Sequence, residues 1–113
     1  MKRHNLIKLK RIDQKIDPIY FNPKEYEPYI IIEILQEAEK MLPKDGLLYL
    51  AFKNCNTKIC GYKAFLDKGK FPNSFIMKLP REITDGGVSN CRIELCDREK
   101  TSMPTREFQI IVK

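Results

Sequence analysis

The feature that most limits how this chain can fold is a two-residue alternation of apolar and polar side chains in its second half. Apolar residues recur at every second position within residues 48–52, 75–79, 91–95 and 108–112. Because successive side chains of an extended strand point to opposite faces, each segment predicts a strand with one buried face. Short strands that follow one another closely, with turn residues between them, are typical of a sandwich or a barrel.

The first half of the sequence is less regular. Residues 5–12 fit a strand in which Ile7 and Leu9 face inward, and Pro18 favours an extended conformation for residues 17–21. Turn-forming Gly, Asp and Pro residues separate the predicted strands of the second half. These predicted turns cover residues 44–46, 67–69, 85–87 and 102–104.

Residues 28–42 carry two conflicting patterns. Their apolar residues recur at helical spacing, and Pro28 suits the start of a helix. Residues 29–32 are instead β-branched and aromatic, which favours a strand. The local pattern predicts a helix within 28–42, and a strand is the alternative.

The length and composition are those of a globular domain. The chain has 113 residues, 42% hydrophobic and 32% charged, so residues 1–113 are expected to form one domain. The longest apolar run, residues 29–32, is far shorter than the roughly 20 residues of a membrane span. The apolar core of a signal peptide does not follow Met1, which predicts folding in the cytoplasm, where thiols stay reduced.

The net charge of +6 is concentrated at the N-terminus. Residues 1–24 contain seven Lys or Arg and two Asp, which gives +5. A basic strand or arm of this kind fits a solvated strand face, which is our preferred interpretation, or a site for nucleic acid or an acidic protein surface. The cations that would contact phosphates are Lys2, Arg3, Lys8, Lys10, Arg11 and Lys15.

Two pairs of cysteines have the same spacing, namely Cys55 with Cys60 and Cys91 with Cys96. Four thiolates can hold a tetrahedral zinc ion, and the predicted hairpin turn between Cys55 and Cys60 would place those two side by side. In a strand, however, residues five apart face opposite sides, so Cys91 and Cys96 are poorly placed for one metal. Cys91 is expected to pack in the core as a small hydrophobe. Plain thiols are therefore preferred, and zinc bound by all four cysteines is the alternative.

The sequence contains no recognisable catalytic motif. His4 is the only histidine, and it lies near the terminus without the positioned partner that general-base catalysis requires. A phosphate-binding glycine loop, a nucleophile elbow and a His-Glu-x-x-His motif are all missing. We therefore expect a protein that binds and is not an enzyme, with no catalytic residue and no cofactor.

Four apolar side chains are left over once the predicted core is filled. Ile76 and Ile111 are out of phase with the core faces of their strands, whereas Tyr20 and Phe21 lie in a proline-bounded extended segment. We predict that these residues contact another protein. The alternative is that the second sheet of the sandwich covers them.

The predicted segments from residue 30 to residue 113 follow a specific order of strands and turns. They are residues 30–35, 36–40, 41–42, 47–53, 54–58, 67–69, 74–80, 81–83, 86–87, 88–97 and 105–112. This order resembles the N-terminal domain of phage baseplate upper proteins, which are immunoglobulin-like antiparallel β-sandwiches. Under this resemblance residues 30–35 form a strand.

The resemblance implies a structural protein of a phage tail or tail-like particle. Such a domain docks onto the baseplate and positions or links a tail fibre or receptor-binding protein. Its expected partners are other tail, baseplate or fibre proteins, with several copies in a symmetric assembly and no membrane contact. Proteins of that family usually continue into a coiled or fibrous region that holds the receptor-binding protein, whereas this sequence ends at Lys113, so the resemblance implies either a stand-alone adaptor or a trimmed relative.

Overall fold

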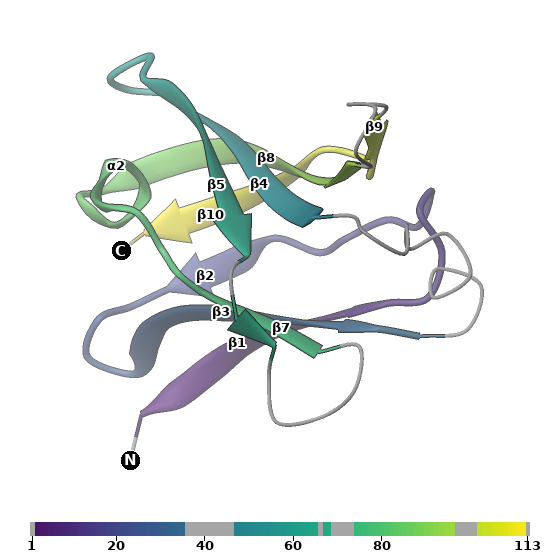
Figure 1. Cartoon of the computed structure of the whole chain (residues 1–113). Helices are drawn as coiled ribbons and strands as arrows, with labels where there is room; N and C mark the ends of the chain where they lie inside the picture. Colours follow the sequence, from purple (N-terminus) through teal and green to yellow (C-terminus); the bar gives the residue numbers. More distant parts are fainter. Residues whose placement is uncertain (1, 36–46, 66, 69–73, 97–101, 113) are drawn as a thin grey trace.

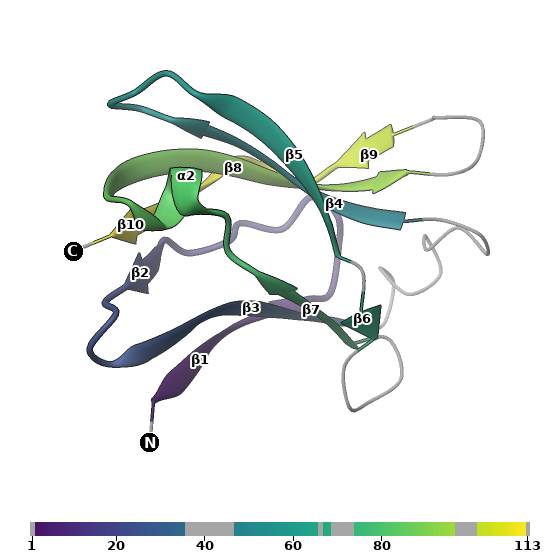
Figure 2. The ribbon, with the colours of Figure 1, turned by 60° about the vertical axis from the view of Figure 1, so that its left-hand side comes forward.

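Two β-sheets face each other and enclose the hydrophobic core (Figure 1, Figure 2). The computed structural model describes residues 2–35, 47–65, 67–68, 74–96 and 102–112. Strands dominate these residues, and the one helix among them is the single turn α2 (Arg81–Thr84). The prediction of a mainly β, sandwich-like fold is confirmed.

The first sheet contains four strands. Their order across the sheet is β1 (Arg3–Leu9), β3 (Tyr26–Ile34), β7 (Ser74–Lys78) and β6 (Asp67–Lys68). Strands β1 and β3 run parallel, whereas β3 with β7 and β7 with β6 are antiparallel. Strand β1, which was predicted as the basic strand or arm, therefore forms one edge of this sheet.

The second sheet contains six strands. Five of them lie in the order β2 (Ile19–Phe21), β10 (Phe108–Val112), β8 (Gly87–Cys96), β4 (Leu47–Asn54) and β5 (Cys60–Phe65). The sixth strand, β9 (Ser102–Pro104), pairs with the end of β8. Strands β2 and β10 run parallel, and the other pairs are antiparallel.

The two parallel pairs, β1 with β3 and β2 with β10, differ from the antiparallel pairing predicted for the whole sandwich. Side chains alternate between the two faces in the same way in parallel and antiparallel strands. The apolar pattern therefore predicts that a strand exists and which face is buried, but not the direction of its neighbour.

The conflict over residues 28–42 is resolved for its first part. Residues 28–34 belong to strand β3, so the predicted helix is wrong there, and residues 36–42 lie outside the described part of the chain. Strand β3 lies between β1 and β7, and its inward residues Ile30, Ile32 and Ile34 are fully or almost fully buried. Burial of such a side chain contributes about 1.5–3 kcal/mol, which outweighs helix propensities of less than about 1 kcal/mol per residue.

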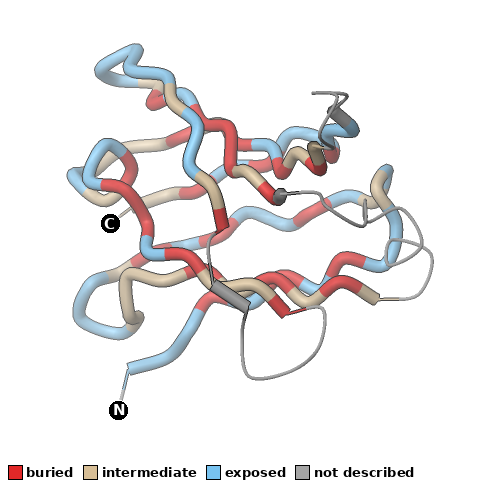
Figure 3. The backbone as a smooth tube through the Cα atoms, in the orientation of Figure 1, coloured by how far each residue is buried: buried red, intermediate tan, exposed pale blue. Residues whose placement is uncertain are grey.

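The core is built from the inward faces of both sheets, as the alternation predicts. Buried and exposed positions alternate along the strands, as the coloured tube of Figure 3 shows. In strand β7, Met77 is buried as predicted but Phe75 is only partly buried. The predicted inward residues that are buried are Ile7, Leu9, Leu48, Leu50, Phe52, Met77, Leu79, Cys91, Ile93, Leu95, Phe108 and Ile110.

Two predicted turns are strands in the structure. Residues 102–104 form β9, and residues 67–68 form β6. Strand β9 lies on the same side of β8 as β10, and Thr105 follows it, so that the Thr105 N–H donates to the Ile93 carbonyl at 2.8 Å. The Thr105 hydroxyl accepts a hydrogen bond from the Ile93 N–H at 3.0 Å, which continues the ladder between the two strands. The predicted turn at residues 85–87 is confirmed, since Gly86 and Gly87 have positive φ angles of 130° and 80°.

Gly61 allows the edge strand β5 to pack under an aromatic ring. It lies opposite Phe52 of β4, and a Cβ atom at Gly61 would lie 2.6 Å from Cζ of Phe52. The Phe52 ring is itself buried in the core, so it has little room to move aside.

We predict that Gly61→Val lowers the free energy of unfolding by about 1–3 kcal/mol, because the new side chain overpacks the Phe52 ring. Urea denaturation followed by circular dichroism measures the change. Tyr62→Val is the matched control, since Tyr62 is 66% exposed on the opposite face of the same strand, and its effect should stay within about 0.5 kcal/mol. An equal loss in both variants would contradict the packing argument.

Candidate docking surfaces

An apolar row crosses the outer face of the first sheet, and we call it the first-sheet row. Leu6 of β1 lies opposite Ile31 of β3, which lies opposite Ile76 of β7. Leu6 is 47% exposed, and the two isoleucines are partly buried. Ile76 was predicted to lie outside the core, and the structure places it on the outer face.

A second apolar row crosses the outer face of the second sheet, and we call it the second-sheet row. Tyr20 of β2 lies opposite Ile111 of β10, which lies opposite Val88 of β8. Tyr20 is 51% exposed, while Ile111 and Val88 are partly buried. Two residues that were predicted separately as contacts, Tyr20 and Ile111, are therefore neighbours.

Phe21 does not lie on either outer face. It is only 3% exposed, because β2 is a true strand in which Ile19 and Phe21 face inward and Tyr20 faces outward. The prediction of Phe21 as an exposed contact is wrong, since the prolines suggested an irregular segment to which the two-residue alternation was not applied.

Sequence reasoning missed three members of the rows, namely Leu6, Ile31 and Val88. A signal for Leu6 was available, because Ile7 and Leu9 were predicted to face inward, which turns residue 6 outward. The same signal was available for Val88, which is out of phase with Cys91, Ile93 and Leu95, whereas the helical pattern of residues 28–42 obscured Ile31.

The predicted basic residues are exposed but do not form a separate arm. Arg3 and Lys8 belong to strand β1, whereas Lys10, Arg11 and Lys15 lie in the connection to β2. Arg11 pairs with Asp13 at 3.6 Å, and both side chains are exposed, so the pair adds little stability. The six exposed cations are Lys2, Arg3, Lys8, Lys10, Arg11 and Lys15.

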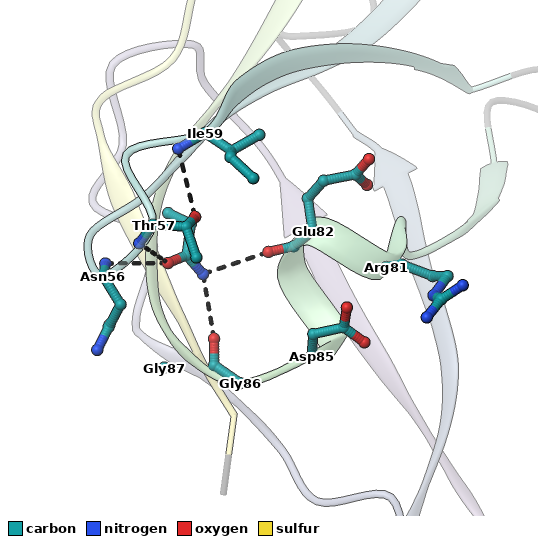
Figure 4. Close-up of a pocket in the computed structure, with 9 residues that line it drawn as sticks. Asn56, Thr57, Ile59, Arg81, Glu82, Asp85, Gly86 and Gly87 are labelled. Carbon is teal, nitrogen blue, oxygen red and sulfur yellow. Dashed lines mark hydrogen bonds between the residues drawn. The ribbon is translucent and has the colours of Figure 1, made fainter.

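A pocket of about 550 Å³ lies at one end of the sandwich, between the β4–β5 hairpin and helix α2 (Figure 4). Its exposed charged residues are Arg81, Glu82 and Asp85, all from α2 or its end. The wall of this pocket is held together by the side chain of Asn54, which is only 1% exposed.

Both ends of the Asn54 amide are used within the fold. Its Nδ2 donates to the carbonyls of Glu82 at 3.2 Å and Gly86 at 3.1 Å, and its Oδ1 accepts from the backbone N–H groups of Asn56 at 2.9 Å and Thr57 at 3.0 Å. Asn54 thus links the β4–β5 hairpin to the segment that leads into β8. These hydrogen bonds hold together the wall of the pocket at this end of the sandwich.

We predict that Asn54→Ala lowers the free energy of unfolding by about 2–4 kcal/mol, because four partly buried backbone groups lose their hydrogen-bond partner at once. Thermal and urea denaturation provide the measurement. Asn56→Ala removes a neighbouring exposed amide and serves as the control, with an expected effect within about 0.5 kcal/mol. A loss of less than 1 kcal/mol for Asn54→Ala would contradict this role.

The four cysteines do not converge on one point. Cys60 lies opposite Lys53 and is exposed, whereas Cys55 lies beyond the end of β4 and accepts a hydrogen bond from Asn90 at 3.4 Å. Cys91 is buried in the core, as predicted, and Cys96 lies at the far end of β8. Within the described residues, no three His, Cys, Asp or Glu side chains form a group that could hold a metal ion. The arrangement therefore does not support a zinc ion bound by all four cysteines.

Burial raises the pKa of the Cys91 thiol from about 9.0 to about 12, with smaller contributions from Glu107 and Cys55. Because the pKa of the thiol is higher in the folded than in the unfolded state, its protonated form stabilises the fold, and this contribution to the free energy of unfolding is complete below pH 9. That contribution is lost progressively as the pH rises from about 9 to about 12.

We predict that the free energy of unfolding falls by about 1 kcal/mol for each pH unit above 9, in excess of the fall seen in Cys91→Val. Urea denaturation of both proteins at several pH values between 8 and 11 tests this difference. Parallel pH profiles would show that Cys91 does not titrate in this way.

The fold has a counterpart among solved structures. The N-terminal domain of ORF48 from phage TP901-1 matches with a TM-score of 0.63 at 10% sequence identity, over 97% of this chain and 98% of that chain. No protein-family model matches the sequence, and no curated protein sequence matches it significantly. The match to a phage domain agrees with the predicted resemblance in fold. Among the described residues, no helix is long and apolar enough to cross a membrane.

Proposed function

We propose that this chain is a structural protein of a phage tail or tail-like particle, and that it works by binding other proteins of that particle. The observation that carries the proposal is its likeness in fold to the N-terminal domain of phage TP901-1 ORF48, which extends over nearly the whole of both chains. Because fold alone is a weak guide to function, the outer faces of the sandwich supply the second argument.

The two rows are apolar, as the centres of protein interfaces are, and the second-sheet row includes one aromatic residue, Tyr20. The centres of such interfaces are apolar and rich in aromatic residues, and polar residues surround them. Leu6 in the first-sheet row and Tyr20 in the second-sheet row are each about half exposed. Because the rows lie on the outer faces of opposite sheets, one domain can hold two neighbours at once. A protein that docks onto a baseplate and positions or links a tail fibre needs such an arrangement.

In this role the chain folds in the host cytoplasm, binds no cofactor and then joins the particle. Several symmetry-related copies multiply the strength of individually weak contacts. The four cysteine thiols and the pocket between the β4–β5 hairpin and helix α2 have no part in the proposed function.

We predict that the tagged chain sediments with intact particles in a density gradient, in a constant ratio to the main tail protein. Immunoblotting and mass spectrometry of the gradient fractions measure this ratio. In cells that do not assemble particles, the same chain should stay at the top of the gradient. A chain that stays at the top even when particles form would contradict the proposal.

Nucleic-acid binding through residues 2–15 is the alternative function, and the exposure of all six predicted cations favours it. It requires an affinity for duplex DNA or RNA that falls steeply as the salt concentration rises. Fluorescence anisotropy with a labelled duplex distinguishes the two functions, because a docking protein should not bind the duplex at about 0.15 M salt.

A further inference from the structure

A pocket of about 370 Å³ opens between the two sheets at the side where β1 and β2 form their edges, and we call it the side pocket. It is lined mainly by β1, by β2 and by the connection that crosses between them from one sheet to the other (Figure 1). The buried side chains of Ile7, Ile16 and Ile19 give it apolar walls. Its volume lies within the roughly 300–1,000 Å³ of ligand pockets and far exceeds the roughly 30 Å³ that one water molecule occupies. The side pocket can therefore hold more than an ordered water molecule.

Asn5 brings an unbonded amide to the inner wall of the side pocket. It is only 8% exposed and faces inward, as Ile7 of the same strand does. Among the described residues, the Asn5 Nδ2 is buried and has no hydrogen-bond partner. Gln14, the other amide in the lining, is bonded within the chain, since it donates to the Lys8 carbonyl at 2.9 Å and accepts from the Lys10 N–H at 2.6 Å. Because buried amides are almost always bonded, the Asn5 amide calls for a partner from outside the chain.

The chemistry of the Asn5 amide indicates which group can bind it. A carboxamide carries both a donor and an acceptor, and its last side-chain torsion is soft enough to turn either atom toward the pocket. The neutral complement is another amide, and the peptide group is the amide that any extended segment presents. A carboxylate or phosphate offers only acceptors and an ammonium only donors, and each would lose its hydration at a buried site. The apolar walls then accommodate an apolar side chain next to that peptide group.

The exposed apolar residues of both rows meet at the side pocket. Leu6 of the first-sheet row and Tyr20 of the second-sheet row both line it, and they are the most exposed members of their rows, at 47% and 51%. The exposed charged residues of the lining have both signs, namely Lys8, Lys15 and Asp17. A segment that enters the pocket therefore gains apolar contact with both rows and needs no particular net charge.

A second copy of the chain offers no suitable segment in its described part. Outside the side pocket, its exposed large apolar side chains are Ile59, Tyr62 and Met103. The N–H of Ile59 donates to the Thr57 hydroxyl at 3.3 Å, and its carbonyl accepts from the Asn54 N–H at 2.9 Å. Tyr62 and Met103 lie in strands, where side chains stand perpendicular to the sheet and peptide groups point along it. None of the three can bring its side chain and a free peptide group into the pocket together.

We propose that the side pocket binds an extended segment of a different protein, with a peptide group bonded to the Asn5 amide and an apolar side chain between Ile7, Ile16 and Ile19. This inference rests on the proposed function, since the partner is another protein of the particle. The segment enters through its side chain and one peptide group, not as an added strand, because Gln14 occupies part of the β1 edge.

The test uses the full chain in cells that assemble the particle. Asn5→Leu removes the donor and the acceptor but keeps a branched side chain, and Leu6→Ser removes apolar contact at the mouth of the pocket. Their matched controls are Asn56→Leu and Ile59→Ser, which change exposed residues of the β4–β5 hairpin, and Ile59 is 48% exposed. Thermal denaturation shows which purified variants are folded, and Asn5→Ala, which needs no extra room, replaces Asn5→Leu should that variant unfold.

We expect Asn5→Leu and Leu6→Ser each to lower the amount of chain in purified particles by about tenfold relative to the wild type. Both controls should join particles at the wild-type level. The melting temperature of Asn5→Leu should equal or exceed that of the wild type, because the lost amide has no partner within the described residues. A purely structural role of Asn5 would instead lower the melting temperature.

A cross-link identifies the bound segment. A photo-reactive phenylalanine in place of the exposed Lys15 should cross-link to one segment of a different particle protein. A synthetic peptide of that segment should bind the wild-type chain and bind Asn5→Leu at least about tenfold more weakly. Because the recognised group is neutral, its affinity should change by less than about twofold between about 0.05 and 0.5 M salt.

The outcomes separate this inference from the function on which it rests. A wild-type chain that is absent from particles overturns both. A wild-type chain that joins particles, together with Asn5 and Leu6 variants that join equally well, overturns the inference alone and leaves the Asn5 amide to water. A cross-link from position 15 to a second copy of the chain or to nucleic acid overturns it too, as does a peptide whose affinity falls steeply with salt.

Discussion

Strand β8 forms backbone hydrogen bonds along both of its edges, and the second sheet depends on these two ladders. On one side it pairs with all of β4, from Leu47 to Asn54. On the other side it pairs first with β10 and then with β9. Its residues Cys91, Ile93 and Leu95 are buried, so a slip of one residue would turn an apolar face toward water. The register that this burial fixes also places Val88 beside Ile111 in the second-sheet row.

Much of the fold follows from the two-residue alternation, because burial of one strand face leaves the same signal in any β-sandwich. The predicted inward residues of β1, β4 and β8 are buried in the structure, and so are those of β10 except Val112, which is only partly buried. The alternation does not indicate the direction of neighbouring strands. The parallel pairs of β1 with β3 and of β2 with β10 were therefore not predicted. At residues 28–34 the local pattern was misleading, since strand pairing on both sides of β3 outweighs helix propensity. Residues 102–104 looked like a turn because Pro104 was not expected at the sheet edge, where proline is tolerated.

The candidate docking surfaces were only partly predictable. The reasoning that a residue out of phase with its core face must point outward placed Ile76 and Ile111 correctly on outer faces. It failed at Phe21, because the alternation within the short strand β2 was not recognised. Which residues come together on one face is a property of register between strands distant in sequence. The pairing of Tyr20 with Ile111 joins segments about ninety residues apart, and no local pattern contains that information.

The edge strand β1 could in principle take part in binding through its backbone instead of its outer face. Part of that edge is already occupied, because the Gln14 side chain donates to the Lys8 carbonyl at 2.9 Å and accepts from the N–H groups of Lys10 at 2.6 Å and Arg11 at 3.0 Å. Charged side chains such as Lys8 further discourage the addition of a strand from another chain. A partner that reaches this side of the sandwich therefore meets side chains before it meets free backbone groups. At this end of β1, recognition through the side chains of the first-sheet row is therefore favoured over the addition of a strand to the edge.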